Sequence, residues 1–497
     1  MDTGSASVRT AALRGVEALP VTVEVSTSGG IPGLDIVGMP DSAVLEARSR
    51  VRCALRSSGF TLPRLHVTIN LAPSEMRKSG TGFDLPMAVA ILMATHQLSP
   101  EVARDSLFVG ELALDGSVCP VRGDVAYALL AQREGSTLVT AAASPLSAAW
   151  HDEARGIQTL AQLKGGVREL APLGVKSSQT GLDAQGARLD FSDVVDQELA
   201  KRALVVAAAG RHGMLMVGPP GAGKTMLARR MPTILPPLEG REAAEAMLVH
   251  SVAGQPIDAL SRGERPFRAP HHSISVGGLV GGGRPVLPGE VSLADRGILF
   301  LDELPEFTRG ALQALRQPLE DHEVRIVRVD GVYAFPCDFQ LVAAANPCPC
   351  GHLGDPGHAC TCPPAKVSAY QARIGGPLID RIDVVVDVAR PMSSRVIQGQ
   401  QGTGSSEMES QVSAARAFAD WRRSRRRSAD SDPVTQADLT GEARSTFERL
   451  AAGLALGGRA IVRVARVART IADLAEHERV EPDDVVEAVG LRARASS

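Results

Sequence analysis

The 497-residue sequence has no long apolar run. Its most apolar stretches, such as 85–95 and 203–209, are far shorter than the roughly 20 residues that a membrane-spanning helix needs. The amino terminus also lacks the basic stretch followed by an apolar one that marks a secretory signal, because acidic and basic side chains are scattered through it. These absences predict a cytoplasmic protein without a membrane partner.

The sequence also lacks an excess of either charge. Its 53 Lys and Arg residues against 56 Asp and Glu residues give a net charge of -3, so any basic surface must be local. No repeat of roughly 20–50 residues is present. With 44% hydrophobic and 22% charged residues the composition is that of a globular protein, and the length predicts about three domains.

Alternating apolar strands and helical stretches predict an α/β multidomain protein. Residues 8–170 carry this alternation and predict an α+β or α/β domain. The strands predicted there are 21–25, 66–71, 106–109 and 137–140, and the helices include 42–57 and 85–93. Strand–turn–helix units that start near Asp190 predict a parallel sheet flanked by helices, with strands at 214–217, 297–301, 339–345 and 384–388. The last part of the chain predicts a small helical domain whose last helix starts at Glu481. Two polar, Gly-rich and Ser-rich stretches have linker composition. The predicted limits are 1–170, 171–188 (linker), 189–392, 393–406 (linker) and 407–497.

The octapeptide GPPGAGKT follows an apolar strand and precedes a helical stretch, which is the context of a phosphate-binding loop. Its glycines let backbone N–H groups face the phosphates of ATP. Lys224 can reach the β and γ oxygens, and Thr225 can place a hydroxyl on Mg²⁺. A chance Gly-rich turn would not bring both flanking elements. The predicted cofactor-binding residues are Gly218, Pro219, Pro220, Gly221, Ala222, Gly223, Lys224, Thr225 and, from a later strand, Asp302.

Two later strands end in polar side chains of the kind that phosphate hydrolysis needs. The strand GILFL is followed by Asp302 and Glu303. The first carboxylate can hold Mg²⁺ and the second can activate the attacking water, with a plain strand-end turn as the alternative. The strand in DFQLVAAAN ends at Asn346, at the sheet edge where the γ-phosphate would lie. The upstream phosphate-binding loop favours catalytic roles for Glu303 and Asn346.

This order of parts resembles the AAA+ ATPases, with Walker A at 218–225, Walker B at 298–303 and sensor 1 at Asn346. The stretches between these parts resemble the helix-2 insert and the pre-sensor hairpin of the magnesium-chelatase and MCM branch. In that branch a lid arginine acts as sensor 2, and the segment GGRAIVRVARVARTIADLA offers Arg459 or Arg463; we assign Arg459.

The segment GGPLIDRIDVVVDV resembles the arginine-finger region of the same branch, in which one subunit supplies an arginine to the ATP of its neighbour. The resemblance therefore implies that Arg381 is catalytic. A local ion pair of Arg381 with Asp380 or Asp383 is the alternative.

The resemblance covers nearly the whole chain. NLAPSEMRKSGTGFDLPMAVAIL, FRAPHHS, LFLDELPEF and ARTIADL are similar to segments of the ComM/YifB family of bacterial magnesium-chelatase-like ATPases. That family implies a homo-hexameric ring that hydrolyses ATP as a DNA helicase. It migrates DNA branches while single-stranded DNA from natural transformation recombines, and recombination proteins are further candidate partners. The ATPase subunit of a metal chelatase and an ATP-dependent protease are the alternative functions.

Residues 66–142 resemble the proteolytic domain of Lon. In this resemblance Gly82 stands at the position of the nucleophilic serine and Val125 at the position of the lysine. Neither side chain can take part in Ser–Lys chemistry. We therefore expect a Lon-protease-like, catalytically dead domain that is not a peptidase and that serves assembly or contacts with DNA or partner proteins.

Four of the seven cysteines form the pattern C-x-C-x9-C-x-C. In a reducing compartment this crowding favours a metal over disulfides. A closed set of four thiolates suits structural Zn²⁺, whereas metal-free thiols and redox-linked pairs are the alternatives. The predicted zinc ligands are Cys348, Cys350, Cys360 and Cys362.

Basic residues gather in three places that could contact DNA. An arginine-rich run around Trp421 suits phosphate contacts, with a solvated charged face as the alternative. In a ring helicase the axial inserts are the stronger candidates. The residues are Arg416, Arg422, Arg423, Arg425, Arg426 and Arg427 in the run, Arg325 and Arg328 in the hairpin, and His271, His272 and Arg284 in the helix-2 insert.

Overall fold

The computed structural model describes residues 4–62, 64–146, 154–173, 189–355, 357–374, 378, 381–392, 394, 397, 402–425 and 433–492. Most of the linker predicted at 171–188, half of the one predicted at 393–406, Asp380, Arg426 and Arg427 lie outside this part. No helix within the described ranges is long and apolar enough to cross a membrane.

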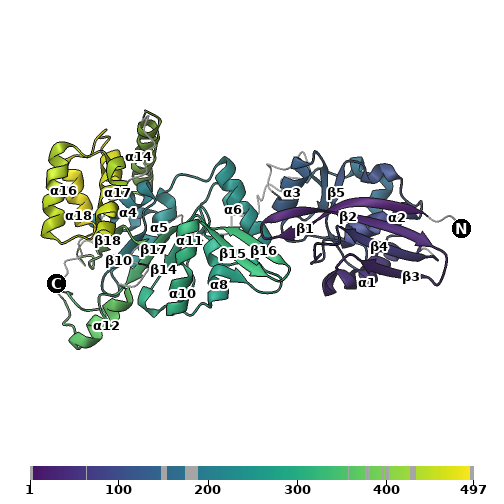
Figure 1. Cartoon of the computed structure of the whole chain (residues 1–497), viewed down its shortest axis with the longest axis horizontal. Helices are drawn as coiled ribbons and strands as arrows, with labels where there is room; N and C mark the ends of the chain where they lie inside the picture. Colours follow the sequence, from purple (N-terminus) through teal and green to yellow (C-terminus); the bar gives the residue numbers. More distant parts are fainter. Residues whose placement is uncertain are drawn as a thin grey trace.

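A seven-stranded mixed sheet forms the amino-terminal region, at the right of Figure 1, in the order β3-β4-β2-β1-β5-β8-β9. Its centre is the long antiparallel pair of β1 and β2. Three of the four strands predicted here fall within an observed strand, and the fourth, 106–109, extends one residue past β5. The strand bounds are β1 (Ser5–Arg14), β2 (Glu17–Ser28), β3 (Gly33–Val37), β4 (His66–Ala72), β5 (Ser106–Phe108), β6 (Glu111–Leu112), β7 (Val118–Cys119), β8 (Thr137–Ala141) and β9 (Ala154–Ile157).

Three helices pack with this sheet: α1 (Ser42–Ser57), α2 (Asp84–Ala94) and α3 (Asp124–Arg133). The side chain of Asp41 caps α1 by accepting a hydrogen bond from the backbone of Val44. Every residue of α2 is buried, which explains the unbroken apolar sequence that follows Asp84. The predicted helices 42–57 and 85–93 are confirmed.

The central region is a five-stranded parallel sheet in the order β11-β14-β17-β10-β18. Its strands are nearly continuous apolar runs because both faces are covered. The four strands and the parallel sheet predicted from the sequence are confirmed. The bounds are α4 (Glu198–Gly210), β10 (Met214–Val217), α5 (Lys224–Arg230), α6 (Gly240–Ala253), β11 (Phe267–Arg268), β14 (Ile298–Leu301), β17 (Gln340–Ala345), α12 (Pro364–Ile374) and β18 (Val384–Asp387).

Two insertions interrupt this sheet. The second is a two-stranded hairpin, as predicted, and carries Arg325 and Arg328. The bounds are α7 (Asp258–Ser261), α8 (Val276–Val280), β12 (Gly281–Gly282), β13 (Leu287–Pro288) and α9 (Glu290–Leu293) in the first, then α10 (Arg309–Ala314), α11 (Arg316–Asp321), β15 (Glu323–Arg328) and β16 (Gly331–Pro336).

The amino-terminal region rests on the central region at two places. Arg14, the last residue of β1, donates from Nη2 to the carbonyl of Asp330 at the hairpin tip, over 3.2 Å. The start of α3 lies against α6, where the backbone N–H groups of Gly123 and Val125 donate to the carbonyl and the hydroxyl of Ser251. The hairpin is therefore held from the amino-terminal side (Figure 1).

Helices close the carboxyl-terminal end of the chain, drawn from green (α14) to yellow (α16, α17 and α18) in Figure 1. One buried cluster joins them to α4 and to the central sheet. The predicted helix start at Glu481 is confirmed, since Glu481 caps the last helix. The bounds are α14 (Ser405–Arg425), α15 (Pro433–Ala437), α16 (Gly441–Gly453), α17 (Gly458–Leu474) and α18 (Pro482–Gly490).

Candidate functional site

The phosphate-binding loop connects β10 to α5 at the carboxyl edge of the central sheet. Gly221 and Gly223 adopt φ values of 78° and 90°, which residues with a Cβ rarely reach. A Cβ at either position would meet no atom within 4 Å, so the loop is bare on that side. Helix α5 starts at Lys224 with no acidic residue in its first turn, which leaves its N–H groups for an external anion.

Lys224 is held by neutral acceptors. Its Nζ donates to the carbonyls of Gly218 and Pro219, over 2.7 and 3.0 Å, and to Oδ1 of Asn346 over 3.1 Å. Burial lowers the pKa of Lys224, while Asp302 and Glu303 act in the opposite direction. The ammonium thus lies between the loop and the end of β17, where a phosphate oxygen could replace these acceptors.

Thr225 and Asp302 meet across the same edge. The Thr225 hydroxyl donates to Oδ2 of Asp302 over 2.6 Å. Strands β14, β17 and β10 are parallel neighbours, so Asp302, Asn346 and the loop must converge. A hydroxyl and a carboxylate at this distance form an oxygen pair of the kind that Mg²⁺ binds.

Glu303 follows Asp302 in a left-handed conformation, with φ of 51°. Such a conformation costs about 1–3 kcal/mol in a residue other than glycine. The carboxylate is 57% exposed and faces Nδ1 of His272 at 3.7 Å. We expected His272 in an insert that reaches DNA, but the structure places its ring beside Glu303. The parallel pairing of β11 with β14, not visible in the sequence, causes this proximity.

Arg381 and Arg459 lie elsewhere, at the other end of β10. Both line a cavity of about 810 Å³ next to Gly213, which precedes β10, whereas the phosphate-binding loop follows that strand. Arg381 forms an ion pair with Glu320. This partner differs from the two carboxylates considered from the sequence, of which Asp380 lies outside the described residues. The structure therefore brings the two arginines together but not to the Lys224 of the same chain.

The four clustered cysteines converge. The Sγ atoms of Cys348, Cys350 and Cys360 are 3.4–3.6 Å apart, and all four Sγ atoms lie within 4.8 Å of one another. A tetrahedral site with Zn–S bonds of about 2.3 Å has edges of about 3.8 Å. Backbone hydrogen bonding, first from His352, lowers the pKa of Cys350 to about 5. The geometry and chemistry of the donors fit Zn²⁺.

The cysteine loop touches the phosphate-binding loop directly. A Cβ at Gly351 would come within 2.5 Å of Pro220 Cδ, so the contact requires glycine. Arg390 adds a polar link, because its Nε donates to the carbonyl of Pro220 over 3.3 Å and its Nη1 lies 3.4 Å from Asp355 of the cysteine loop. The cysteine loop is thus linked to Pro220 of the phosphate-binding loop both by packing and by Arg390.

Packing fills the two positions, Gly82 and Val125, that the sequence resemblance aligned with the serine and the lysine of a protease. A Cβ at Gly82 would approach Val109 to 3.2 Å, and Val125 is fully buried. The nearby hydroxyl of Thr81 donates to Glu111, and the Lys78 ammonium donates to the carbonyl of Pro73. None of these groups forms a hydroxyl–amine pair.

Three family models match consecutive parts of the chain. They are "Subunit ChlI of Mg-chelatase" over 23–144, "Magnesium chelatase, subunit ChlI" over 190–396 and "Magnesium chelatase, subunit ChlI C-terminal" over 402–492. Competence protein ComM of Haemophilus influenzae is 39% identical over 98% of this chain and 97% of its own. Uncharacterized protein YifB of Escherichia coli is 38% identical over 98% and 96%. The magnesium-chelatase 67 kDa subunit of Heliobacterium mobile is 27% identical over 34% and 30%.

Proposed function

The chain belongs to the ComM/YifB family of magnesium-chelatase-like AAA+ ATPases, and on this basis we propose that it is an ATP-driven motor that acts on DNA. Its reaction is branch migration by a homo-hexameric ring during recombination of transforming DNA. The observation that supports ATP hydrolysis best is the convergence of Lys224, Thr225 and Asp302 at one sheet edge. Support for DNA as the substrate is the similarity to a competence protein along the whole chain.

Each group at the edge has a role in ATP hydrolysis. Lys224 binds the β and γ phosphate oxygens, while the N–H groups of the loop and of α5 hold the remaining oxygens. Thr225 and Asp302 would hold Mg²⁺, which neutralises phosphate charge when bound. Glu303 orients water and accepts its proton, and Asn346 positions that water against the γ-phosphate.

Arg381 and Arg459 act on the nucleotide of a neighbouring subunit. Their shared cavity at the far end of β10 from Lys224 supports this assignment, because neither guanidinium lies at its own phosphate-binding loop. A cation that meets the γ-phosphate only in the assembled ring makes hydrolysis depend on the neighbour. The Arg381–Glu320 ion pair would then be exchanged for the phosphate.

The cysteine loop is a structural zinc site with Cys348, Cys350, Cys360 and Cys362 as ligands. The convergence of the four Sγ atoms supports this proposal. Zinc would order a loop that has little apolar packing of its own, and the loop would in turn fix Pro220 of the phosphate-binding loop.

The amino-terminal region is a Lon-protease-like domain without peptidase activity, within the domain limits 1–170, 189–392 and 407–497. Its contacts with the hairpin and with α6 support a role in assembly. The domain holds the hairpin from one side, and the hairpin and the preceding insert supply the DNA contacts.

The decisive test is whether DNA stimulates ATP hydrolysis. We expect single-stranded and branched DNA to raise turnover well above the rate without DNA, and we expect purified protein to move a branch point only with ATP. Lys224→Ala serves as the control and should lose nucleotide affinity and both activities. If no form of DNA changed the rate of ATP hydrolysis while nucleotide binding stayed intact, DNA would not be the substrate. Only the proposed ATPase activity would then stand.

The ATPase subunit of a metal-chelatase-type remodelling complex is the second candidate. All three matching family models carry magnesium-chelatase names, which favours it. Against it, the magnesium-chelatase subunit of Heliobacterium mobile matches only 34% of this chain. ATP hydrolysis that is independent of DNA would favour this candidate over the motor.

A further inference from the structure

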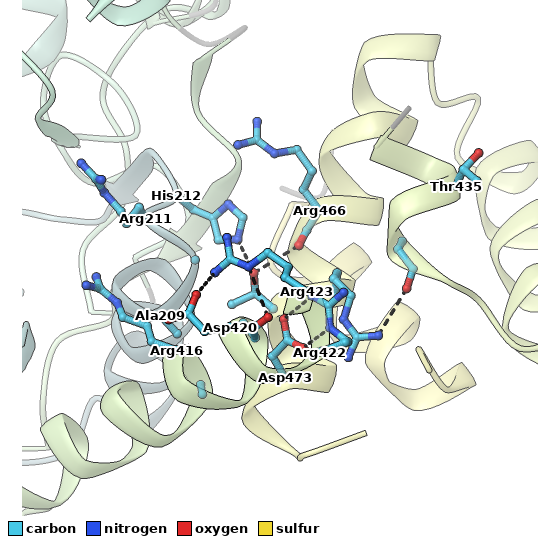
Figure 2. Close-up of a pocket in the computed structure, with 16 residues that line it drawn as sticks. Ala209, Arg211, His212, Arg416, Asp420, Arg422, Arg423, Thr435, Arg466 and Asp473 are labelled. Carbon is cyan, nitrogen blue, oxygen red and sulfur yellow. Dashed lines mark hydrogen bonds and ion pairs between the residues drawn. The ribbon is translucent and has the colours of Figure 1, made fainter. Parts of the chain in front are cut away.

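The arginine-rich run on α14 divides into two groups. Arg423 and Arg425 are exposed, and Arg425 lies over the Trp421 ring at 4.7 Å. Arg416 and Arg422 instead lie partly buried where α14 packs beside the end of α4 and the last turns of α17 (Figure 2). The alternative considered from the sequence, a solvated charged face, therefore holds for only part of the run.

These helices enclose a cavity of about 700 Å³, within the size of ordinary ligand pockets. Six arginines line it against two aspartates. Both aspartates are already paired: Asp473 with Arg422 and Arg469, and Asp420 with Arg423. The six arginines are Arg211, Arg416, Arg422, Arg423, Arg466 and Arg469.

The remaining arginines find no carboxylate inside the cavity. Arg211 pairs with Asp338, and Arg466 lies 3.8 Å from Asp383, and neither of these acids belongs to the cavity lining. Figure 2 shows Arg211 and Arg416 on the same side of His212, with Arg466 reaching over from α17. The cavity therefore carries positive charge that its own walls do not neutralise.

Arg416 is the most exceptional of these groups. Its Nη2 donates to the carbonyl of Ala208 over 2.7 Å, but its Nε is buried without an acceptor. Among the described residues no carboxylate forms an ion pair with it. Burial, together with the nearby charges of Arg265 and Arg211, lowers its pKa to about 10, while the more weakly acting Glu242 and Asp420 oppose this shift. A partly buried cation without an ion-paired carboxylate destabilises a fold, so an external anion is the expected partner.

We propose that this cavity binds the phosphate groups of a polyanion, with Arg416 at its centre and Arg423 and Arg466 as further ligands. Guanidinium groups suit phosphate because their forked N–H donors match its oxygens. The described lining has alanines between the arginines and no Phe, Tyr or Trp on which a base could stack. The shared chemistry is a chain of phosphates, either free oligophosphate or the backbone of a nucleic acid. This inference does not depend on the proposed ATPase reaction.

The site is separate from the phosphate-binding loop. Arg211 and His212 precede β10, whereas Gly218 follows it, so the two anion sites flank opposite ends of one strand. A purely structural role for Arg416, as a donor to the last turn of α4, is the competing explanation. The two explanations predict opposite effects on stability when the charge is removed.

The test compares Arg416→Met with Arg425→Gln, in full-length protein that also carries Lys224→Ala to weaken binding at the phosphate-binding loop. Met keeps much of the side-chain volume without the charge, and Arg425→Gln removes one charge from the same helix outside the cavity. Equilibrium dialysis measures binding of inorganic tripolyphosphate in one arm and of single-stranded oligothymidylate in the other. Melting temperature is recorded with and without each probe.

We expect Arg416→Met to weaken binding of at least one probe about tenfold or more, whereas Arg425→Gln binds as its parent does. Without probe, Arg416→Met should melt at or above the parent's temperature. A tripolyphosphate effect assigns the site to free oligophosphates. An effect on the oligonucleotide alone assigns it to a nucleic-acid backbone. Equal binding by both variants, no binding of either probe, or a lower melting temperature of Arg416→Met without probe would overturn the proposal.

Discussion

The central and amino-terminal regions both start a helix directly after a Gly-containing turn, yet only one of these helix ends is open to a ligand. Helix α5 begins with Lys224 and has no acid in its first turn. Helix α2 begins with Asp84, which is buried and accepts hydrogen bonds from Nε and Nη2 of Arg50 over 2.6 and 3.0 Å. The positive end of α2 is therefore satisfied from within the fold.

Helix α3 repeats the second pattern. It follows Gly123, which has φ of 88°, and begins with the buried carboxyl group of Asp124. A glycine turn and a helix start are thus not sufficient for phosphate binding. At these two ends the fold supplies its own acceptors, because the N–H of Leu85 in α2 donates to the carbonyl of Gly110 and the N–H of Val125 in α3 donates to the hydroxyl of Ser251.

Arg381→Ala should have the largest effect on turnover. An arginine that meets transition-state charge is worth about 10³–10⁵ in rate, so ATPase activity should fall by orders of magnitude while folding and nucleotide binding persist. The measurement is steady-state hydrolysis beside nucleotide affinity. A loss of hydrolysis with nucleotide binding retained would show that the open end of α5 binds ATP but supports hydrolysis only with an arginine from a neighbouring subunit.

The defect of Arg381→Ala should act in trans. Its subunits keep an intact Lys224, and Lys224→Ala subunits keep an intact Arg381, so mixed rings contain some complete sites. Partial recovery on mixing is expected. Normal hydrolysis by Arg381→Ala alone, or no recovery when mixed rings form, would contradict the assignment.

Glu303→Gln should come next. The amide keeps the shape of the side chain but cannot accept a proton, so turnover should fall about 10²–10⁴-fold with ATP still bound. Glu306→Gln, an exposed carboxylate one turn further on, is the matched control and should hydrolyse normally. Turnover of Glu303→Gln within a few-fold of the parent would remove this carboxylate from the mechanism.

Loss of the metal should have a smaller effect. Protein purified without chelator should contain about one zinc per chain, and Cys360→Ser with Cys362→Ser should lose it. Because the cysteine loop contacts Pro220 without supplying catalytic groups, ATPase activity or assembly should weaken several-fold while the fold persists. Cys53→Ser is the control, because Cys53 is exposed on α1 in the amino-terminal region and does not belong to the cysteine loop. Less than about a tenth of an equivalent of zinc would leave the metal-free interpretation.

Much of the fold could be predicted because the sequences of most central strands differ clearly from the sequences that flank them. The strands of the central sheet are short apolar runs bounded by glycine or charged residues, so β10, β14, β17 and β18 were all predictable. Strand β1 was missed, since the pairing that makes it a strand comes from β2. Among the candidate site residues, the predicted cofactor-binding residues Lys224, Thr225 and Asp302 follow from local motif chemistry.

Contacts between distant segments could not be predicted. The position of His272 beside Glu303 depends on the pairing of β11 with β14. The ion pair between Arg381 and Glu320 joins residues from two elements that no motif relates. The contact of Gly351 with Pro220 is also set by how two loops pack. Sequence periodicity describes single elements, and these features belong to the packing between them.

Substitutions at the amino-terminal ends of α2 and α3, the two closed helix ends that start with buried aspartates, should have the smallest effect on turnover. Asp124→Asn tests the end of α3. Burial raises the pKa of Asp124 to about 7 from an ordinary value of 3.8, and one of its carboxylate oxygens has no hydrogen-bond partner. The folded state therefore binds this proton more tightly than the unfolded state does. Its stability should be greatest below about pH 4 and should fall as the pH rises to about 7, by roughly 2–4 kcal/mol.

Asp124→Asn should abolish that pH dependence and leave ATPase activity unchanged, because the side chain lies outside the nucleotide site. Hydrogen exchange of peptides from α3, corrected for the intrinsic effect of pH and compared between pH 5 and 8, reports the local stability. Asp84→Asn provides the contrast: it should destabilise the region at pH 8, because Arg50 would lose its two-pronged carboxylate partner. If Asp124→Asn kept the slope of the parent protein, the carboxyl group would not be the source of the pH dependence. The closed helix end at α3 would then be an ordinary charged one, stabilised by the same dipole that α5 offers to phosphate.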